Sequence, residues 1–404
     1  MSSSKYVILG GGMVAGYAAK ALVEGGLRSA ELTIISADDT SPYERPPLSK
    51  GFLAGKDTED GILINRPDWY REKGIEIKLQ TVIESVDLQK KRLLSSSSQK
   101  FEYEILLIAT GCRARRLESP GNDLANIFYL RSIDDSRKLR TRAETAKRAV
   151  VVGGGFIGME VASVLAQKNI QTAMIMREDR VWKRAFTPEM SAFFERYYTA
   201  RGIQLFKQAN IAALEGKGSV NAVVLDDGTR IPCDMAVVGV GAAPVTELFA
   251  KTEISNDNGI VVNEYLETAR PSVFAAGDVA DYPDLIFDKR RRAEHWDNAV
   301  SQGQHWARVV LGDRQPFVHV PYFFSDVFDL SYELWGDSDG ATQTVVRGEP
   351  DSSKFSVWWL KQGRLVAAFV MNRPDEEKNV APEWIRSKQP VSAKRLADQA
   401  HALT

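Results

Sequence analysis

Cysteine is scarce in this chain of 404 residues, and the few histidines are widely scattered. Only Cys112 and Cys233 occur, and neither belongs to a CxxC or CxxxxC pair. A dithiol relay of the kind that some oxidoreductases use therefore cannot be formed. The histidines show no metal-ligand spacing, so no metal site is expected and each is interpreted as a packing or surface residue. These histidines are His295, His305, His319 and His401.

Long apolar runs and an excess of one charge are also missing. The chain has 52 basic and 53 acidic residues, a formal net charge of −1, which gives no basic excess to attract nucleic acid or an anionic membrane. No apolar run approaches the ~20 residues that a membrane helix needs. The first apolar strand begins at about Lys5, which leaves no room for a signal peptide. We therefore expect a cytoplasmic protein with no nucleic-acid or membrane partner.

What the chain does contain is two glycine-rich turns, each following an apolar strand and opening a helix. The second turn has the full GxGxxG pattern, whereas the first has Ala15 in the third key place. Such a turn lets the backbone approach a pyrophosphate and sets it on a helix N-terminus. A tight turn without a ligand is the alternative for either motif alone. The two turns are Gly10, Gly11, Gly12, Met13, Val14, Ala15 and Gly153, Gly154, Gly155, Phe156, Ile157, Gly158.

Two turns in one chain favour two dinucleotides held face to face, which is how a hydride passes from a nicotinamide to a flavin. The strand, helix and strand at 5–10, 13–25 and 31–36 form one βαβ unit, and residues 149–177 form another. Further buried strands are expected at 101–111, 235–241 and 272–279. The second strand of the first unit is followed by Asp38, which is placed to bind ribose hydroxyls.

The predicted fold class is therefore α/β, with two nested Rossmann-like dinucleotide-binding domains, as in glutathione reductase, and a small α+β domain at the C-terminus. The outer domain comprises 1–113 and 247–320, the inner domain 114–246, and the C-terminal domain 321–404. In the last part, a β-hairpin turns at Gln362-Gly363 and a helix spans about 375–387.

Six motifs occur in a fixed order: the loop Pro42–Lys50, the turn Ala109–Gly111, Gly153–Glu160, Ala276–Val279, Glu294–His295 and Pro321–Asp326. Together they resemble the FAD-dependent NAD(P)H reductases that include ferredoxin and rubredoxin reductases, apoptosis-inducing-factor-like proteins and monodehydroascorbate reductase. The resemblance covers essentially the whole chain. The stretch Pro374–Asn379 looks most like the monodehydroascorbate reductase branch.

The resemblance implies a site residue by residue. It implies that Lys50 lies at the N5 side of the flavin and pairs with Glu160. Both roles are physically reasonable, because a buried ammonium needs a carboxylate partner and a lysine near N5 stabilises the reduced flavin. The helix from Trp296 points its positive end at the flavin. Besides the first turn, the implied FAD residues are Asp38, Arg45, Lys50, Ile83, Ala109, Thr110, Gly111, Arg131, Gly277, Asp278, Glu294, His295, Trp296 and Phe324. Besides the second turn, the implied NAD(P)H residues are Arg177, Glu178, Lys183 and Gly241.

Two questions stay open: whether the nicotinamide cofactor is NADPH or NADH, and which molecule accepts the electrons. An NAD site usually has an acid directly at the end of its second strand; here that place is Met176, followed by Arg177, which favours NADPH. Glu178 aligns with a glutamate that serves NADH in monodehydroascorbate reductases. Those enzymes also have an arginine at the place of Val300 and a tyrosine at the place of Phe324.

The expected reaction is hydride transfer from NADPH or NADH to FAD, and then transfer of single electrons to a small acceptor. That acceptor is either a ferredoxin or rubredoxin type carrier or the monodehydroascorbate radical.

The basic run Lys289–Arg292 either docks an acidic carrier or is simply solvated. An oxidase that reduces oxygen is an alternative, although related oxidases use a cysteine where this chain has Ser49. A flavin-bound signalling protein is another, and the chain is expected to be a monomer or homodimer.

Overall fold

The computed structural model describes residues 2–28 and 30–403, which cluster into two compact units. The loop at 46–58 falls in the second unit, although the sequence assigned it to the outer domain. The three-domain division itself stays a prediction. The first unit holds the chain as far as Arg45, then Glu59–Arg113 and Ala243–Tyr322; the second holds Pro46–Thr58, Ala114–Ala242 and the chain from Phe323 onward. Two of the places where the chain passes from one unit to the other lie in the short strands β7 (Cys112–Ala114) and β16 (Ala242–Pro244).

A seven-stranded sheet forms the centre of the first unit. Its parallel strands run in the order β3-β2-β1-β6-β19, and β5 and β4 continue antiparallel from the first half of β6. The inner strands are apolar and buried, as expected for a parallel sheet covered on both faces. The strands are β1 (Ser2–Leu9), β2 (Leu32–Ile35), β3 (Glu76–Lys78), β4 (Ile83–Asp87), β5 (Arg92–Ser95), β6 (Lys100–Ile108) and β19 (Val273–Ala275).

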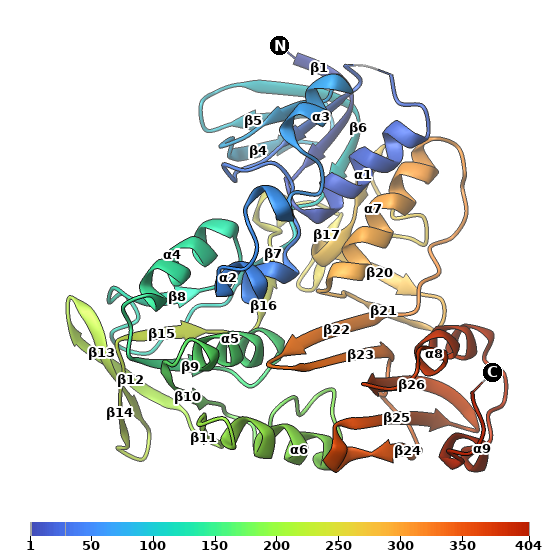
Figure 1. Cartoon of the computed structure of the whole chain (residues 1–404). Helices are drawn as coiled ribbons and strands as arrows, with labels where there is room; N and C mark the ends of the chain where they lie inside the picture. The colour runs from blue at the N-terminus through green and yellow to red at the C-terminus, as the bar shows by residue number, and fades with distance from the viewer. Residues whose placement is uncertain (1, 29, 404) are drawn as a thin grey trace. The chain divides into compact units, whose positions relative to one another are not determined.

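Two helices pack closely against each other in this unit. Figure 1 shows α1 (Met13–Glu24, blue) and α7 (Trp296–Val310, orange) side by side. A Cβ on Gly303 would lie 2.8 Å from the Val14 carbonyl oxygen, so only glycine allows this approach. The unit also contains α3 (Pro67–Glu72), the 3-10 turns η2 (Asp60–Ile62), η3 (Glu247–Phe249) and η4 (Gly277–Val279), and a sheet of β17 (Ser255–Asn256), β18 (Gly259–Val261), β20 (Ala280–Asp284) and β21 (Lys289–Arg291).

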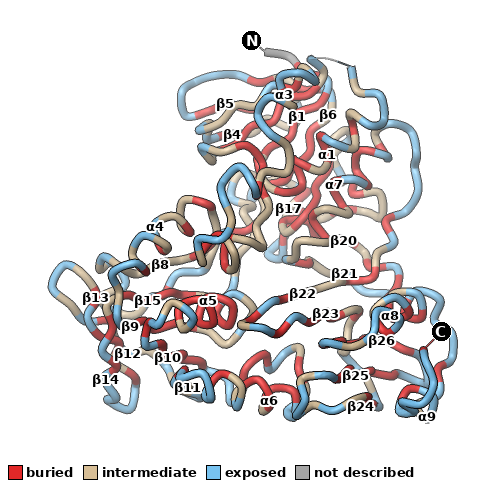
Figure 2. The backbone as a smooth tube through the Cα atoms, viewed as in Figure 1, coloured by how far each residue is buried: buried red, intermediate tan, exposed pale blue. Residues whose placement is uncertain are grey.

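The second unit contains a five-stranded parallel sheet in the order β11-β10-β9-β15-β8. Figure 2 shows that its helix α5 is almost entirely buried. The elements are η1 (Pro46–Ser49), α2 (Gly51–Ala54), β8 (Ile127–Tyr129), α4 (Ile133–Ala143), β9 (Arg148–Val152), α5 (Phe156–Gln167), β10 (Gln171–Ile175), α6 (Pro188–Thr199), β11 (Gln204–Phe206) and β15 (Met235–Val238), with an antiparallel sheet of β12 (Ile211–Lys217), β13 (Ser219–Leu225) and β14 (Arg230–Pro232).

The C-terminal part of this unit is a five-stranded antiparallel sheet with helices. The predicted hairpin is confirmed as β25 and β26, which turn at Gln362 and Gly363, and the predicted helix is confirmed as α8. The elements are β22 (Tyr322–Val327), β23 (Leu330–Gly336), β24 (Gln343–Glu349), η5 (Pro350–Ser352), β25 (Lys354–Lys361), β26 (Arg364–Met371), α8 (Asp375–Ser387) and α9 (Ala393–Ala397).

The α/β fold class is confirmed, with a nucleotide-binding type of sheet in each unit. Within the described ranges, no helix is both long enough and apolar enough to span a membrane.

Candidate cofactor and active site

The first glycine turn lies between β1 and α1 and leaves no room for side chains. A Cβ on Gly10, whose φ is +123°, would lie 2.2 Å from the Ala109 carbonyl oxygen. A Cβ on Gly11 would lie 2.2 Å from Ser36 Oγ. Gly12 is the N-cap of α1 and makes no side-chain cap hydrogen bond. The first N–H groups of α1 are therefore free of a side-chain cap, as in a phosphate-binding turn.

Arg45 and the turn after β6 lie against this cradle. A Cβ on Gly12 would lie 3.6 Å from Arg45 Nη2, so the guanidinium lies beside the start of α1. Ala109, Thr110 and Gly111 follow β6, and Gly10 lies against Ala109 and Thr110. A guanidinium beside an uncapped helix N-terminus is chemically suited to a pyrophosphate. These residues fit the diphosphate of FAD.

Glu44 connects the Arg45 loop to both helices. Its carboxylate accepts a hydrogen bond from the Tyr17 hydroxyl of α1 and another from Trp296 Nε1 of α7, the latter at 2.5 Å. Burial, and then the hydrogen bond to Glu44, raise the pKa of Tyr17 well above its ordinary value. Sequence reasoning missed this contact because Glu44 and Trp296 are 252 residues apart.

Asp38 lies just beyond the end of β2, where a ribose would be expected. Its half-buried carboxylate accepts a hydrogen bond from the Tyr43 hydroxyl at 3.2 Å, and its own N–H donates to Ser36 Oγ at 3.1 Å. The Thr81 N–H donates to the Ser36 carbonyl at 2.8 Å, which brings the segment leading to Ile83 next to the same strand end.

The remaining predicted FAD residues of the first unit gather at α7 and η4. The Gly277 N–H donates to Gln302 Oε1 at 2.7 Å, and a Cβ on Gly277 would lie 2.6 Å from Val14 Cγ2. Asp278 follows Gly277 in η4. His295 is the N-cap of α7 without a side-chain cap hydrogen bond, and α7 begins at Trp296 as predicted. The neighbouring Glu294 carboxylate is held by Arg292 at 2.5 Å.

The second glycine turn, between β9 and α5, has the same construction. A Cβ on Gly153, with φ +112°, would lie 2.2 Å from the Gly239 carbonyl oxygen, and one on Gly158 would lie 2.0 Å from the Gly153 oxygen. Gly155, the N-cap of α5, has no side-chain cap, and among the described residues no atom beyond its chain neighbours lies within 4 Å of where its Cβ would stand. Gly241, with φ +102°, follows β15. This cradle fits a second dinucleotide.

Strand β10 ends in a buried methionine that is followed by exposed charged residues. Met176 is buried. An apolar side chain therefore occupies the position at which an NAD site usually has an acidic residue for the ribose hydroxyls. Arg177 and Glu178 are exposed directly after it. Lys183 forms an ion pair with Asp179 at 3.2 Å. Among the described residues, Arg177 forms no ion pair, whereas Arg180 also pairs with Asp179, at 3.5 Å.

The structure brings the predicted pair Lys50 and Glu160 together in the second unit. Lys50 Nζ lies 2.9 Å from Glu160 Oε1, with 16% and 5% of the two side chains exposed. Phe324 lies over the ammonium, with its ring centroid 5.0 Å from Nζ. Glu160 also accepts hydrogen bonds from the hydroxyls of Ser49 and Ser325. Sequence reasoning missed both serines, since nothing local marks a serine that meets a carboxylate 111 or 165 residues away.

The predicted FAD residues are thus divided between the units. Arg131 precedes α4 in the second unit, where its N–H donates to Asp135 Oδ2 at 3.1 Å. Lys50 and Phe324 also belong to that unit, whereas Arg45 and Asp38 belong to the first.

The basic run Lys289–Arg292 is not an open cationic surface. Arg290 lies 3.4 Å from Asp281, Arg291 lies 2.6 Å from Asp284, and Arg292 lies 2.5 Å from Glu294. Lys289 and Arg290 are nevertheless exposed, so docking of an acidic carrier and simple solvation both stay predictions.

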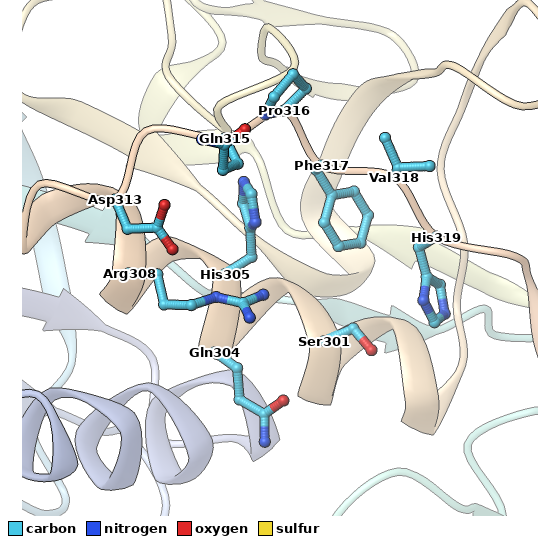
Figure 3. A pocket seen from close by; sticks show the side chains of 10 residues that line it. All are labelled: Ser301, Gln304, His305, Arg308, Asp313, Gln315, Pro316, Phe317, Val318 and His319. Atoms are coloured by element: carbon cyan, nitrogen blue, oxygen red, sulfur yellow. The ribbon is translucent and has the colours of Figure 1, made fainter.

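A polar cavity of about 250 Å³ lies along α7, lined by His305, Arg308, Asp313 and Phe317 among others (Figure 3). None of the predicted site residues lines it. Burial, and then the charge of Arg308, lower the pKa of His305 to about 4. In the part of the chain that is described, no three His, Cys, Asp or Glu side chains are grouped to hold a metal.

Two glycine cradles on uncapped helices, together with a buried lysine–glutamate pair, define an oxidoreductase that uses two dinucleotides. Comparison with known proteins agrees. The family model described as pyridine nucleotide-disulphide oxidoreductase matches residues 4–303, and the model described as reductase C-terminal matches 322–404. The chain belongs to the pyridine nucleotide-disulphide oxidoreductase family. It is an FAD-dependent NAD(P)H oxidoreductase, and its electrons go to a small acceptor.

Relatives of two kinds cover the whole chain. A monodehydroascorbate reductase of Solanum lycopersicum is 36% identical over 421 residues, 98% of this chain and 97% of the relative. The structure of the putidaredoxin reductase–putidaredoxin complex has a TM-score of 0.94 at 30% identity, covering 98% of this chain and 96% of that one. A ferredoxin reductase from Rhodopseudomonas palustris has a TM-score of 0.93 at 30% identity, covering 99% and 98%. The monodehydroascorbate reductase and ferredoxin reductase branches named from the sequence motifs are therefore confirmed as relatives.

Cys112 and Cys233 are both free and buried.

Proposed function

We propose that this chain oxidises NADPH in preference to NADH and passes the electrons singly to the monodehydroascorbate radical. The observation that carries the NADPH preference is the end of β10, where Met176 is buried and Arg177 is exposed. A guanidinium can bind the 2′-phosphate through charge-assisted hydrogen bonds, whereas a methionine cannot accept from ribose hydroxyls. Lys183 supports this less, because Asp179 already pairs with it.

A bound flavin would supply the chemistry of hydride acceptance and single-electron release. The protein's own contribution is positioning and electrostatics. The Lys50 ammonium is the group that we assign to the negative charge of the reduced flavin, because a buried cation stabilises developing charge best where water is excluded. Glu160 keeps this ammonium buried and oriented.

The radical is proposed as acceptor because the similarity to monodehydroascorbate reductases extends through the C-terminal domain, at 36–39% identity in several relatives. A ferredoxin-type carrier is the second candidate. Val300 is partly buried against the core of the first unit and supplies no cation for an anionic radical. Phe324, at the place of the relatives' tyrosine, has no hydroxyl to offer.

Steady-state turnover of the FAD-loaded protein distinguishes these acceptors. NADPH and NADH are each tested with enzymatically generated monodehydroascorbate radical, with a [2Fe-2S] ferredoxin, and with ferricyanide as a general acceptor. We expect the radical to give a higher kcat/KM than ferredoxin, and a Val300→Arg variant to lower its KM. Ferredoxin turnover above that of the radical would favour the second candidate. Oxygen alone, in the same assay, tests the oxidase alternative.

A cytoplasmic location and a monomer or homodimer remain part of the proposal. The relatives include peroxisomal and chloroplastic forms, so location is tested by expressing the tagged full-length chain in its source cells. Sedimentation velocity tests the oligomeric state.

A further inference from the structure

Strand β22 places two consecutive side chains on the two members of the buried ion pair. The Ser325 hydroxyl donates to Glu160 Oε1 at 2.5 Å, and the Phe324 ring lies 5.0 Å from Lys50 Nζ. Both residues belong to the C-terminal sheet, whereas Glu160 lies in α5. The C-terminal sheet therefore contacts the pair directly.

The Glu160 carboxylate is buried and is contacted by several donors. The residue is 4% exposed, and a buried carboxylate without sufficient hydrogen bonds takes up a proton. Oε1 accepts from Lys50 and Ser325, and Oε2 accepts from Ser49. Three donors from two segments, Ser49–Lys50 and β22, thus surround one carboxylate.

The other titratable groups nearby do not replace these donors. Tyr198 donates its hydroxyl to the Met159 carbonyl at 2.9 Å, not to the carboxylate. Burial raises the pKa of Tyr198 and of Tyr332 well above the ordinary value, so both hydroxyls stay protonated, and the hydroxyl of Tyr332 interacts with Ser325. Asp326, the next residue of β22, is exposed. The two serine hydroxyls are the neutral groups that donate hydrogen bonds to the Glu160 carboxylate.

We propose that Ser325, assisted by Ser49, is a positioning residue that keeps Glu160 ionised and thereby holds Lys50 as an oriented ammonium ion. The role of Lys50 toward the reduced flavin rests on the proposed function. The effect of Ser325 on Glu160 does not, because it follows from contacts within the second unit.

The chain offers a matched control for this serine. Ser356, on β25 of the same sheet, is buried and donates to Glu377 Oε2 at 2.5 Å. Ser356→Ala therefore removes a serine–glutamate hydrogen bond of the same kind, with a similar expected loss of stability, but at a different carboxylate from the one that pairs with Lys50. Ser325→Thr keeps the hydroxyl and should restore what Ser325→Ala loses.

The test is carbon NMR of the full-length, FAD-loaded protein with ¹³C-labelled glutamate carboxyl carbons. The Glu160 signal is identified by its disappearance in Glu160→Gln and is then followed with pH. In Ser325→Ala we expect its proton affinity to rise about tenfold, the consequence of losing one hydrogen bond to a charged group. Ser325→Thr and Ser356→Ala should titrate like the parent protein. Ser49→Ala should repeat the shift, which covers the case of a poorly folded Ser325 variant.

A Glu160 titration that is the same in Ser325→Ala, Ser49→Ala and the parent protein would overturn the inference. Stopped-flow reduction of the flavin by NADPH distinguishes a failure of this inference from a failure of the role proposed for Lys50. If the Glu160 titration shifts and flavin reduction slows, both stand. If the titration shifts while flavin reduction is unchanged, the positioning inference stands and the role proposed for Lys50 fails.

Discussion

Replacing Glu44 by glutamine should loosen the predicted FAD cradle at a defined point. The Glu44 carboxylate accepts from the Tyr17 hydroxyl through one oxygen and from Trp296 Nε1 through the other. A glutamine has one acceptor oxygen and an NH₂ group. In Glu44→Gln, whichever way the amide is turned, one donor faces another donor and loses its partner.

The size of the effect follows from this geometry. A hydrogen bond to a charged group contributes about 1.5–3 kcal/mol, so losing one of the two should lower the free energy of unfolding by roughly 2 kcal/mol. The pKa of Tyr17 should fall but stay above its ordinary value, because burial is the larger cause of its rise. Arg45 follows Glu44 directly and lies beside Gly12, so the affinity for FAD should also fall, roughly tenfold.

Urea unfolding and equilibrium binding of FAD measure the two consequences. Glu84→Gln, at an exposed position of β4, is the control for removing one negative charge. Equal unfolding free energies for the two variants, within about 0.5 kcal/mol, the usual size of a surface effect, would refute the argument that Glu44 is a structural acceptor. Unchanged FAD affinity would refute its role in positioning Arg45.

Two further predictions concern the nicotinamide and pH. Arg177→Glu should raise the KM for NADPH roughly 10- to 100-fold, because it replaces a phosphate-binding cation by an anion, and it should leave the KM for NADH within about a factor of two. The control is Arg184→Glu, at another exposed arginine, which should change neither KM. An unaltered KM for NADPH in Arg177→Glu would contradict the assignment. His305 has its pKa lowered to about 4 by burial, so between pH 4 and the ordinary value near 6.5 the unfolded chain binds a proton that the folded chain does not. The free energy of unfolding should therefore fall as the pH drops through this window, by up to roughly 3 kcal/mol. Urea unfolding at pH 7 and at pH 5 measures this decrease, which should be smaller in His305→Gln than in His401→Gln, the control at an exposed histidine.

Sequence reasoning worked best where the information is local. The α8 helix was predicted to its observed ends at Asp375 and Ser387, and the hairpin was predicted with its turn at Gln362. The glycine turns were recognised because a positive φ and a close backbone approach allow no other residue. Each of these features is encoded in a stretch of fewer than about 20 neighbouring residues.

The partners of the charged side chains could not be predicted in this way. Lys289–Arg292 could be interpreted as a docking patch, yet Arg290 and Arg291 pair with carboxylates on the neighbouring strand β20. The Pro42–Lys50 loop was recognised as a unit, but its first part clusters with one sheet and its second part with the other.

The sequence by itself therefore determined the two cradles, the absence of a dithiol and the family, because spacing and backbone conformation are properties of contiguous residues. Only the tertiary structure decided that Glu44 joins α1 to α7 and that Ser49 and Ser325 converge on Glu160. Apart from the contact between Tyr17 and Glu44, which are 27 residues apart, those contacts join residues more than a hundred positions apart. A serine or a glutamate carries no local mark of the residue it will meet.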